Sequence, residues 1–210
     1  MSWYTSEENF FFSRPRITFA VHRLILINAA VFAAQVALCP LDAYSGYLLG
    51  AGSLAQDWFG FQPGYFLHGM IWTPVTYCFL HGGLMHFFFN MMMLYALGPE
   101  VERTLGTRRF FGFYLLTAAG GVMATFLPAA LFGEFANVIG ASGAPKSVLV
   151  AFVMIDPERQ FRVLPLPFPI TAVGLLVFLV ILNLLASISE SSTTSVATHF
   201  GGIAMGYLLM

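Results

Sequence analysis

The chain has 210 residues, of which 58% are hydrophobic and 9% are charged. An ordinary soluble domain carries roughly 25% charged residues, so this composition excludes a water-soluble domain and indicates an integral membrane protein. The formal net charge is -1, and the basic residues occur singly or in pairs. Because no basic cluster in the sequence could neutralise several phosphates, we expect no nucleic-acid partner.

Six apolar segments are expected to cross the lipid bilayer as helices, since each is long enough for a hydrocarbon core of about 30 Å. The predicted fold class is therefore an all-α integral membrane protein, a six-transmembrane-helix bundle over residues 18–210 behind a cytoplasmic N-terminal segment at residues 1–17. The first apolar run lacks a small-residue cleavage site, so we expect an uncleaved span. The aromatic-rich connection at residues 40–71 is expected to lie at the membrane interface. The expected spans are 18–39, 72–97, 109–132, 138–155, 168–188 and 193–210.

The nine Lys and Arg residues predict the orientation of these spans. Eight of them lie before or at the start of the first span, between the second and third, and between the fourth and fifth. The positive-inside rule then places both termini in the cytoplasm, and the second, fourth and sixth spans run from outside to inside. We expect a multi-pass protein of the plasma membrane. The eight are Arg14, Arg16, Arg23, Arg103, Arg108, Arg109, Arg159 and Arg162.

The fourth span opens with Gly140-Ala141-Ser142-Gly143-Ala144. Neighbours this small let a substrate backbone approach Ser142, and the free N–H groups of a helix N-terminus favour a developing oxyanion. This pattern makes Ser142 a candidate nucleophile. The alternative is a small-residue packing surface with a capping serine.

The sixth span contains His199, followed by Gly201, Gly202 and Gly206. A histidine inside a membrane span is costly and usually functional, and a neutral imidazole is the commonest base for activating a serine hydroxyl. The Gly202-x-x-x-Gly206 spacing predicts a close contact with a neighbouring helix. The alternative role for His199 is a structural hydrogen bond between helices.

The second span contains His86 and Asn90, whose four-residue spacing places both side chains on one helical face. They are candidate donors to the negative oxygen of a tetrahedral intermediate, and the alternative is a polar contact between spans. His81, five residues before His86 and on a different face, is expected to be structural.

Three motifs occur in order along the chain: His86-x-x-x-Asn90 on the second span, Gly140-Ala141-Ser142-Gly143 on the fourth and His199-Phe-Gly-Gly on the sixth. Together they resemble the motifs of the rhomboid intramembrane serine proteases, and the resemblance covers most of the chain. It implies a short fourth span, a water-filled cavity open to the outside with Ser142 at its floor, and a Ser–His dyad in which His199 is the base. It also implies that His86, Asn90 and the Ser142 amide hold the oxyanion. Substrates would be single-span membrane proteins with small or helix-breaking residues, and no cofactor or metal is expected. Two further segments support the resemblance, Trp72-Thr-Pro-Val-Thr-Tyr and Gly98-Pro-Glu-Val-Glu102.

The sequence departs from this family at Pro145 and Lys146, where apolar residues are usual and position 146 is often aromatic. A charge at this depth costs about 2.5–3.5 kcal/mol. Three roles are open for Lys146. It is a hydrated side chain without a part in catalysis, a cation that acts electrostatically on His199, or a neutral lysine that serves as the base. Thr198 replaces a usual alanine, and Trp58 is followed by Phe59 where the family has Trp-Arg.

These departures leave a second function open, namely an inactive rhomboid-like protein that binds membrane proteins and directs their trafficking or degradation. A transporter or channel is less favoured, because the spans carry few other ionisable residues. Cys39 and Cys78 are too few for a disulfide framework and have no metal-ligand spacing. We expect free thiols, with a disulfide between them as the alternative.

Overall fold

A computed structural model describes residues 16–38, 54–133, 135, 137–161, 168–189 and 193–210. The described residues do not include most of the predicted N-terminal segment, Cys39 or Arg162. Cys78 is described, and it is a free, buried thiol. The helices are α1 (Phe19–Leu38), α2 (Leu54–Phe59), α3 (Pro63–Leu67), α4 (Thr73–Thr76), the 3-10 turn η2 (Tyr77–Phe79), α5 (Leu84–Leu105), α6 (Thr107–Met123), α7 (Phe126–Phe132), α8 (Gly143–Ile155), α9 (Ala172–Ser189) and α10 (Thr193–Leu208). The strands are β1 (Gln160–Phe161) and β2 (Ile170–Thr171).

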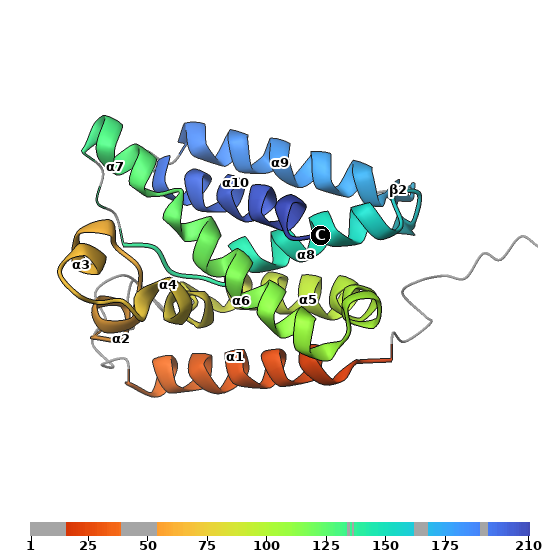
Figure 1. Cartoon of the computed structure of the whole chain (residues 1–210), viewed down its shortest axis with the longest axis horizontal. Coiled ribbons are helices and arrows are strands. Elements are labelled where there is room, and N and C mark those ends of the chain that lie inside the picture. The colour runs from red at the N-terminus through yellow and green to blue at the C-terminus, as the bar shows by residue number, and fades with distance from the viewer. Residues whose placement is uncertain (1–15, 39–53, 134, 136, 162–167, 190–192) are drawn as a thin grey trace, which may run out of the picture.

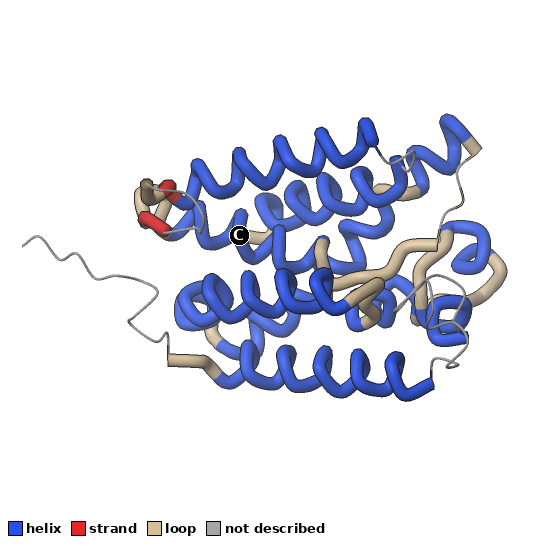
Figure 2. Tube along the Cα trace, turned by 180° about the vertical axis from the view of Figure 1, so that it is seen from behind, coloured by secondary structure: helices blue, strands red, loops and turns tan. Residues whose placement is uncertain are grey.

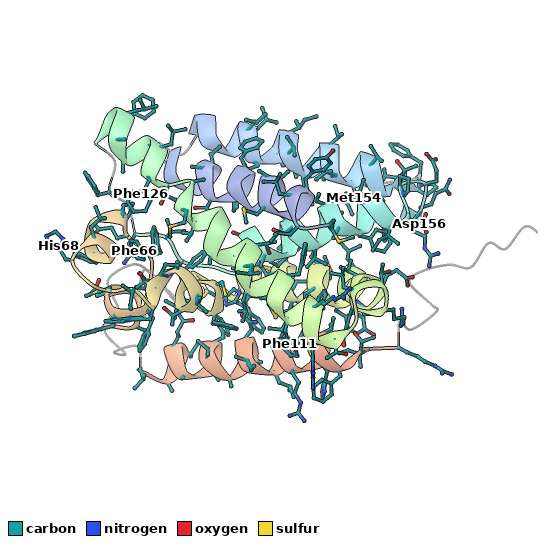
Figure 3. All side chains as sticks on the ribbon, in the orientation of Figure 1. Phe66, His68, Phe111, Phe126, Met154 and Asp156 are labelled. Atoms are coloured by element: carbon teal, nitrogen blue, oxygen red, sulfur yellow. The ribbon has the colours of Figure 1, made fainter. Side chains whose placement is uncertain are left out.

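The long helices α1, α5, α6, α8, α9 and α10 pack side by side in one bundle (Figure 1). The colours of Figure 1 give the direction of each helix along the chain. One end of the bundle carries α2, α3 and α7; helices α1, α6 and α9 run toward it, and helices α5, α8 and α10 run away from it. Phe66 of α3 and Phe126 of α7 meet at that end with ring centroids 6.1 Å apart, and Asp156 lies at the opposite end (Figure 3). The antiparallel pair of β1 and β2 also lies at the opposite end, seen from behind in Figure 2. The arrangement agrees with the predicted alternation of helix directions.

Helix α8 lies at the centre of the bundle, in contact with α5, α6, α9 and α10. Its residues 147–152 are all buried, as expected of a helix that is apolar around its whole circumference. In contrast, α1, α5 and α9 expose many large apolar side chains. By length and composition, Phe19–Leu38 and Thr107–Phe132 are described segments that could cross a membrane, and Gly143–Ile155 and Ala172–Leu185 are shorter apolar helices.

Two predicted span starts were wrong, each because of a local backbone constraint. The segment at 72–97 begins with the short helix α4, which has Pro74 in its first turn, and α5 starts only after the Gly82-Gly83 pair. The segment at 138–155 becomes helical only at Gly143, since Gly140 has a φ of +118° that a helix does not allow. The segment at 109–132 agrees with the described stretch Thr107–Phe132, in which a short turn before Pro128 separates α6 from α7.

Glu102 joins three helices at one end of the bundle. Its two carboxylate oxygens accept hydrogen bonds from the backbone amides of Ala20 and Val21, each at 3.0 Å, and Thr107 donates its hydroxyl hydrogen at 2.8 Å. Glu102 therefore stabilises the turn between α5 and α6 and also caps the N-terminus of α1.

Candidate active site

Ser142 and His199 are hydrogen-bonded across the contact between α8 and α10. The Ser142 hydroxyl oxygen lies 2.7 Å from Nε2 of His199, and both side chains are partly buried. Ser142 is the residue immediately before the first turn of α8, where the backbone N–H groups have no partner within the helix. A serine, an imidazole and a helix N-terminus therefore meet at one point.

The extended segment that leads into Ser142 is held in place by backbone hydrogen bonds. Val138 exchanges bonds of 2.7 and 2.9 Å with Phe61, and the amide of Gly140 donates to the carbonyl oxygen of Tyr77 at 3.0 Å. Tyr77 in turn donates its hydroxyl hydrogen to the carbonyl oxygen of Ala118 on α6 at 2.8 Å. The backbone that leads into Ser142 is therefore fixed by hydrogen bonds to the neighbouring segments.

Close backbone contact positions His199. A Cβ atom on Gly202 would lie 2.5 Å from the carbonyl oxygen of Gly143, and one on Gly206 would lie 2.8 Å from the Cα of Ser147. This confirms the close helix contact predicted from the Gly202-x-x-x-Gly206 spacing. Because α10 touches α8 at backbone distance, the imidazole reaches the serine directly.

His86 and Asn90 lie on α5, next to the Ser142 segment. The His86 ring occupies the place where a side chain on Gly140 would be, so a glycine there allows the ring to approach. Asn90 is 4% exposed, and its Nδ2 is a buried donor without an acceptor among the described residues. The structure therefore places the His86 ring against the segment that leads into Ser142, and a buried amide one turn further along α5.

His81 does not lie on a helix, contrary to prediction, but in the turn between η2 and α5. It is fully buried, and Gln35 of α1 bonds to its backbone at both ends, accepting from the His81 amide at 3.0 Å and donating to its carbonyl at 3.3 Å. These backbone bonds fit the expected structural role.

Sequence reasoning missed Asn183 on α9. Its Oδ1 contacts Nδ1 of His199, on the opposite side of the ring from Ser142. Asn183 belongs to no motif, but it is the one polar residue in the otherwise apolar stretch from Ala172 to Leu185. A lone amide inside a membrane helix is a signal that could have found it.

Lys146 lies half-buried, in a small pocket between α8, α9 and α10. It is close enough to His86 and His199 for electrostatic interaction with both rings. It forms no ion pair within the part of the chain that the structure describes. The pocket is lined by Lys146, Leu149, Leu176, Leu179, Val180, Asn183 and Ile203.

Comparison with known proteins decides the family. A sequence profile for the Rhomboid domain matches residues 68–210, more than half of the chain. The chain belongs to the rhomboid family. This rhomboid is therefore an integral membrane protein with an all-α fold.

The rhomboid is similar to RHOMBOID-like protein 5 of Arabidopsis thaliana, 30% identical over 143 residues, which are 67% of this chain and 43% of that protein. It is 29% identical to Rhomboid protease GluP of Bacillus subtilis over 142 residues, 66% of this chain and 25% of the relative. It is 30% identical to the mitochondrial presenilin-associated rhomboid-like protein of Bos taurus over 132 residues, 61% and 34% of the two chains. The chain spans less than half the length of each of these relatives.

Proposed function

We propose that this rhomboid is an intramembrane serine endopeptidase that hydrolyses peptide bonds in or near the transmembrane segments of other membrane proteins. The observation that carries the proposal is the 2.7 Å hydrogen bond between the Ser142 hydroxyl and Nε2 of His199 at the N-terminus of α8. In this proposal Ser142 is the nucleophile and His199 is the general base.

The reaction follows from this geometry in two halves. His199 Nε2 takes the hydroxyl proton as Ser142 Oγ attacks the substrate carbonyl carbon, and the tetrahedral intermediate collapses when His199 gives that proton to the leaving amine. An acyl ester on Ser142 remains. His199 then removes a proton from a water molecule that attacks the ester, and returns it to Ser142 Oγ as the carboxylic acid product leaves.

His86, Asn90 and the backbone amide of Ser142 are the proposed donors to the oxyanion. The buried Nδ2 of Asn90, which has no acceptor among the described residues, supports this role, because a buried donor gains most from an acceptor that forms during the reaction. The contact of the His86 ring with Gly140, two residues before Ser142, supports a second donor from the same helix.

The short length of α8 supports an active site inside the membrane. A helix of 13 residues is about 20 Å long, less than the roughly 30 Å hydrocarbon core, so the end that carries Ser142 lies below one membrane surface. We propose six spans with the N-terminus in the cytoplasm and the site opening to the outer side of the plasma membrane. Single-span proteins with helix-breaking residues are the proposed substrates, because a helical peptide bond must unwind before attack.

Proteolysis of a single-span substrate in liposomes tests this function. We expect cleavage by the wild type and loss of about 10⁴-fold or more in Ser142→Ala and in His199→Ala. His68→Ala is the matched control, since His68 is exposed and its ring nitrogen bonds to the carbonyl oxygen of Gly64 in the adjoining helix α3. Undiminished cleavage in either of the first two variants would contradict the dyad.

The half-buried lysine beside the nucleophile favours one alternative, an inactive rhomboid-like protein that binds membrane proteins and directs their trafficking or degradation. Lys146 lies one turn after Ser142, and Pro145 precedes it. This alternative predicts that wild type and Ser142→Ala bind the single-span protein equally and that neither cleaves it.

A further inference from the structure

Ser142, His199 and Asn183 form a continuous chain of side-chain hydrogen bonds. Ser142 before α8 bonds to Nε2 of His199 on α10, and Nδ1 of the same ring contacts Oδ1 of Asn183 on α9. We propose that Asn183 is a positioning residue that fixes the ring orientation and the tautomer of His199 for the protease reaction. This inference rests on the proposed function and goes beyond a two-residue dyad.

The chemistry of the two ring nitrogens gives the physical reason. A neutral imidazole carries one N–H and one lone pair, and an amide oxygen only accepts. With Oδ1 of Asn183 facing Nδ1, the proton resides on Nδ1, and the lone pair on Nε2 points at the Ser142 hydroxyl. The base is then in the form that can accept the serine proton. A reversed amide would favour the opposite tautomer, and the measurement of the tautomer below tells the two orientations apart.

The surroundings of Asn183 show why its amide needs the histidine. Asn183 lines the same pocket as Leu176, Leu179 and Val180 of its own helix and Ile203 of α10. An amide among aliphatic side chains is costly unless it is hydrogen-bonded, and the imidazole supplies the bond. The contact therefore stabilises the packing of α9 against α10 and holds the ring at the same time.

A neutral amide suits this site because cationic and titratable groups already face the ring. Lys146 of α8 and His86 of α5 both interact electrostatically with His199, and Lys146 lines the pocket that holds Asn183. Asparagine supplies an acceptor oxygen to the ring without adding a further charge. Cysteine proteases of the papain type use a Cys-His-Asn arrangement with the same order of roles.

Kinetics of single-span substrate cleavage give the first test, with Asn183→Leu and Asn183→Asp. Leu182→Ala is the control, since the neighbouring Leu182 is 44% exposed. We expect kcat to fall by about 10²-fold in Asn183→Leu with KM nearly unchanged, and to stay within about 10-fold of wild type in Asn183→Asp, which keeps an acceptor oxygen. The thermal midpoint in detergent shows whether each variant is folded. Wild-type kcat in a folded Asn183→Leu, or equal losses in the two Asn183 variants, would overturn the proposal.

The tautomer of His199 gives a second test that does not depend on proteolysis. In protein labelled with ¹⁵N-histidine, whose His199 signal is assigned with His199→Gln, we expect Nδ1 to be protonated in the wild type and both tautomers to be populated in Asn183→Leu. A fixed Nδ1–H tautomer without Ser142-dependent cleavage would refute the protease function while supporting the orientation by Asn183. If cleavage requires Ser142 and His199 but Asn183→Leu changes neither the tautomer of His199 nor kcat, the positioning role of Asn183 is refuted and the protease function stands.

Discussion

The hydroxyl oxygen of Ser147 lies 2.7 Å from the carbonyl oxygen of Gly202 and 3.0 Å from that of Gly143. Ser147 is fully buried, so this contact joins α8 to α10 in the interior, just below the point where Ser142 meets His199. The separation of serine and histidine is therefore set by a backbone-distance helix contact. Changes at that contact are expected to alter the chemistry without touching either residue.

Gly202→Ala tests this dependence. The added methyl group would lie 2.5 Å from the carbonyl oxygen of Gly143, and a helix backbone cannot yield as a side chain can. We expect a loss of about 1–3 kcal/mol of stability and a fall of about 10²-fold in kcat, because a displacement near 1 Å is enough to misalign reacting groups. Unfolding in detergent and proteolysis in liposomes measure the two effects.

Gly112→Ala is the matched control on α6, since none of the described atoms lies within 4 Å of the position of its new methyl group. We expect unchanged activity and a stability equal to or slightly above wild type, by about 0.5–1 kcal/mol. Equal effects of the two alanine substitutions would show that the glycines act through helix propensity and not through the contact.

Removal of the Glu102 carboxylate is expected to loosen α1. Glu102→Ala deletes an acceptor that is 3% exposed and serves the amides of Ala20 and Val21 and the hydroxyl of Thr107. Hydrogen bonds to charged groups contribute about 1.5–3 kcal/mol each, so we expect a loss of at least about 2 kcal/mol. Glu100→Ala, which removes an exposed carboxylate whose ion pair among the described residues is with Arg103, should cost less than about 1 kcal/mol. Chemical unfolding of both variants checks the difference, and equal losses would contradict the capping role.

The order and rough positions of the apolar segments could be predicted from the sequence, because hydrophobicity alone determines which residues avoid water. The starts of the second and fourth spans could not, since they depend on local backbone constraints such as the Gly82-Gly83 pair before α5 and the φ of Gly140. His86, Ser142 and His199 could be selected because each lies in a short motif. Asn183 could not be assigned a partner, since a contact between α9 and α10 depends on how two helices rotate against each other.

Loss of a proposed oxyanion donor should affect kcat and leave KM nearly unchanged. We expect Asn90→Ala to lower kcat by about 10²–10³-fold, because its buried amide would be needed only when the oxyanion forms. Met92→Ala on the same helix is the control, since Met92 is 42% exposed on the outside of the bundle. A rise in KM with constant kcat in Asn90→Ala would indicate a role in binding substrate instead.

Lys146→Met separates the three roles considered for the lysine. Because the Ser142 hydroxyl is bonded to His199, we expect the variant to keep kcat within about 10-fold of wild type and to remain dependent on His199. Cleavage that survives His199→Ala but is lost in Lys146→Met would identify the lysine as the base. In the active variant, a displaced pH profile of kcat/KM indicates a cation that acts on His199, and an unchanged profile indicates a bystander.

Labelling of the purified protein with a fluorophosphonate probe tests whether Ser142 is an activated nucleophile, because such probes react with an activated serine whatever the natural substrate is. We expect a single phosphonylated peptide that contains Ser142, absent in Ser142→Ala and strongly reduced in His199→Ala. Ser147, buried on the same helix, serves as the internal control and should remain unmodified. A folded wild-type protein that does not react, or labelling that persists in Ser142→Ala, would contradict the assignment of Ser142 as an activated nucleophile.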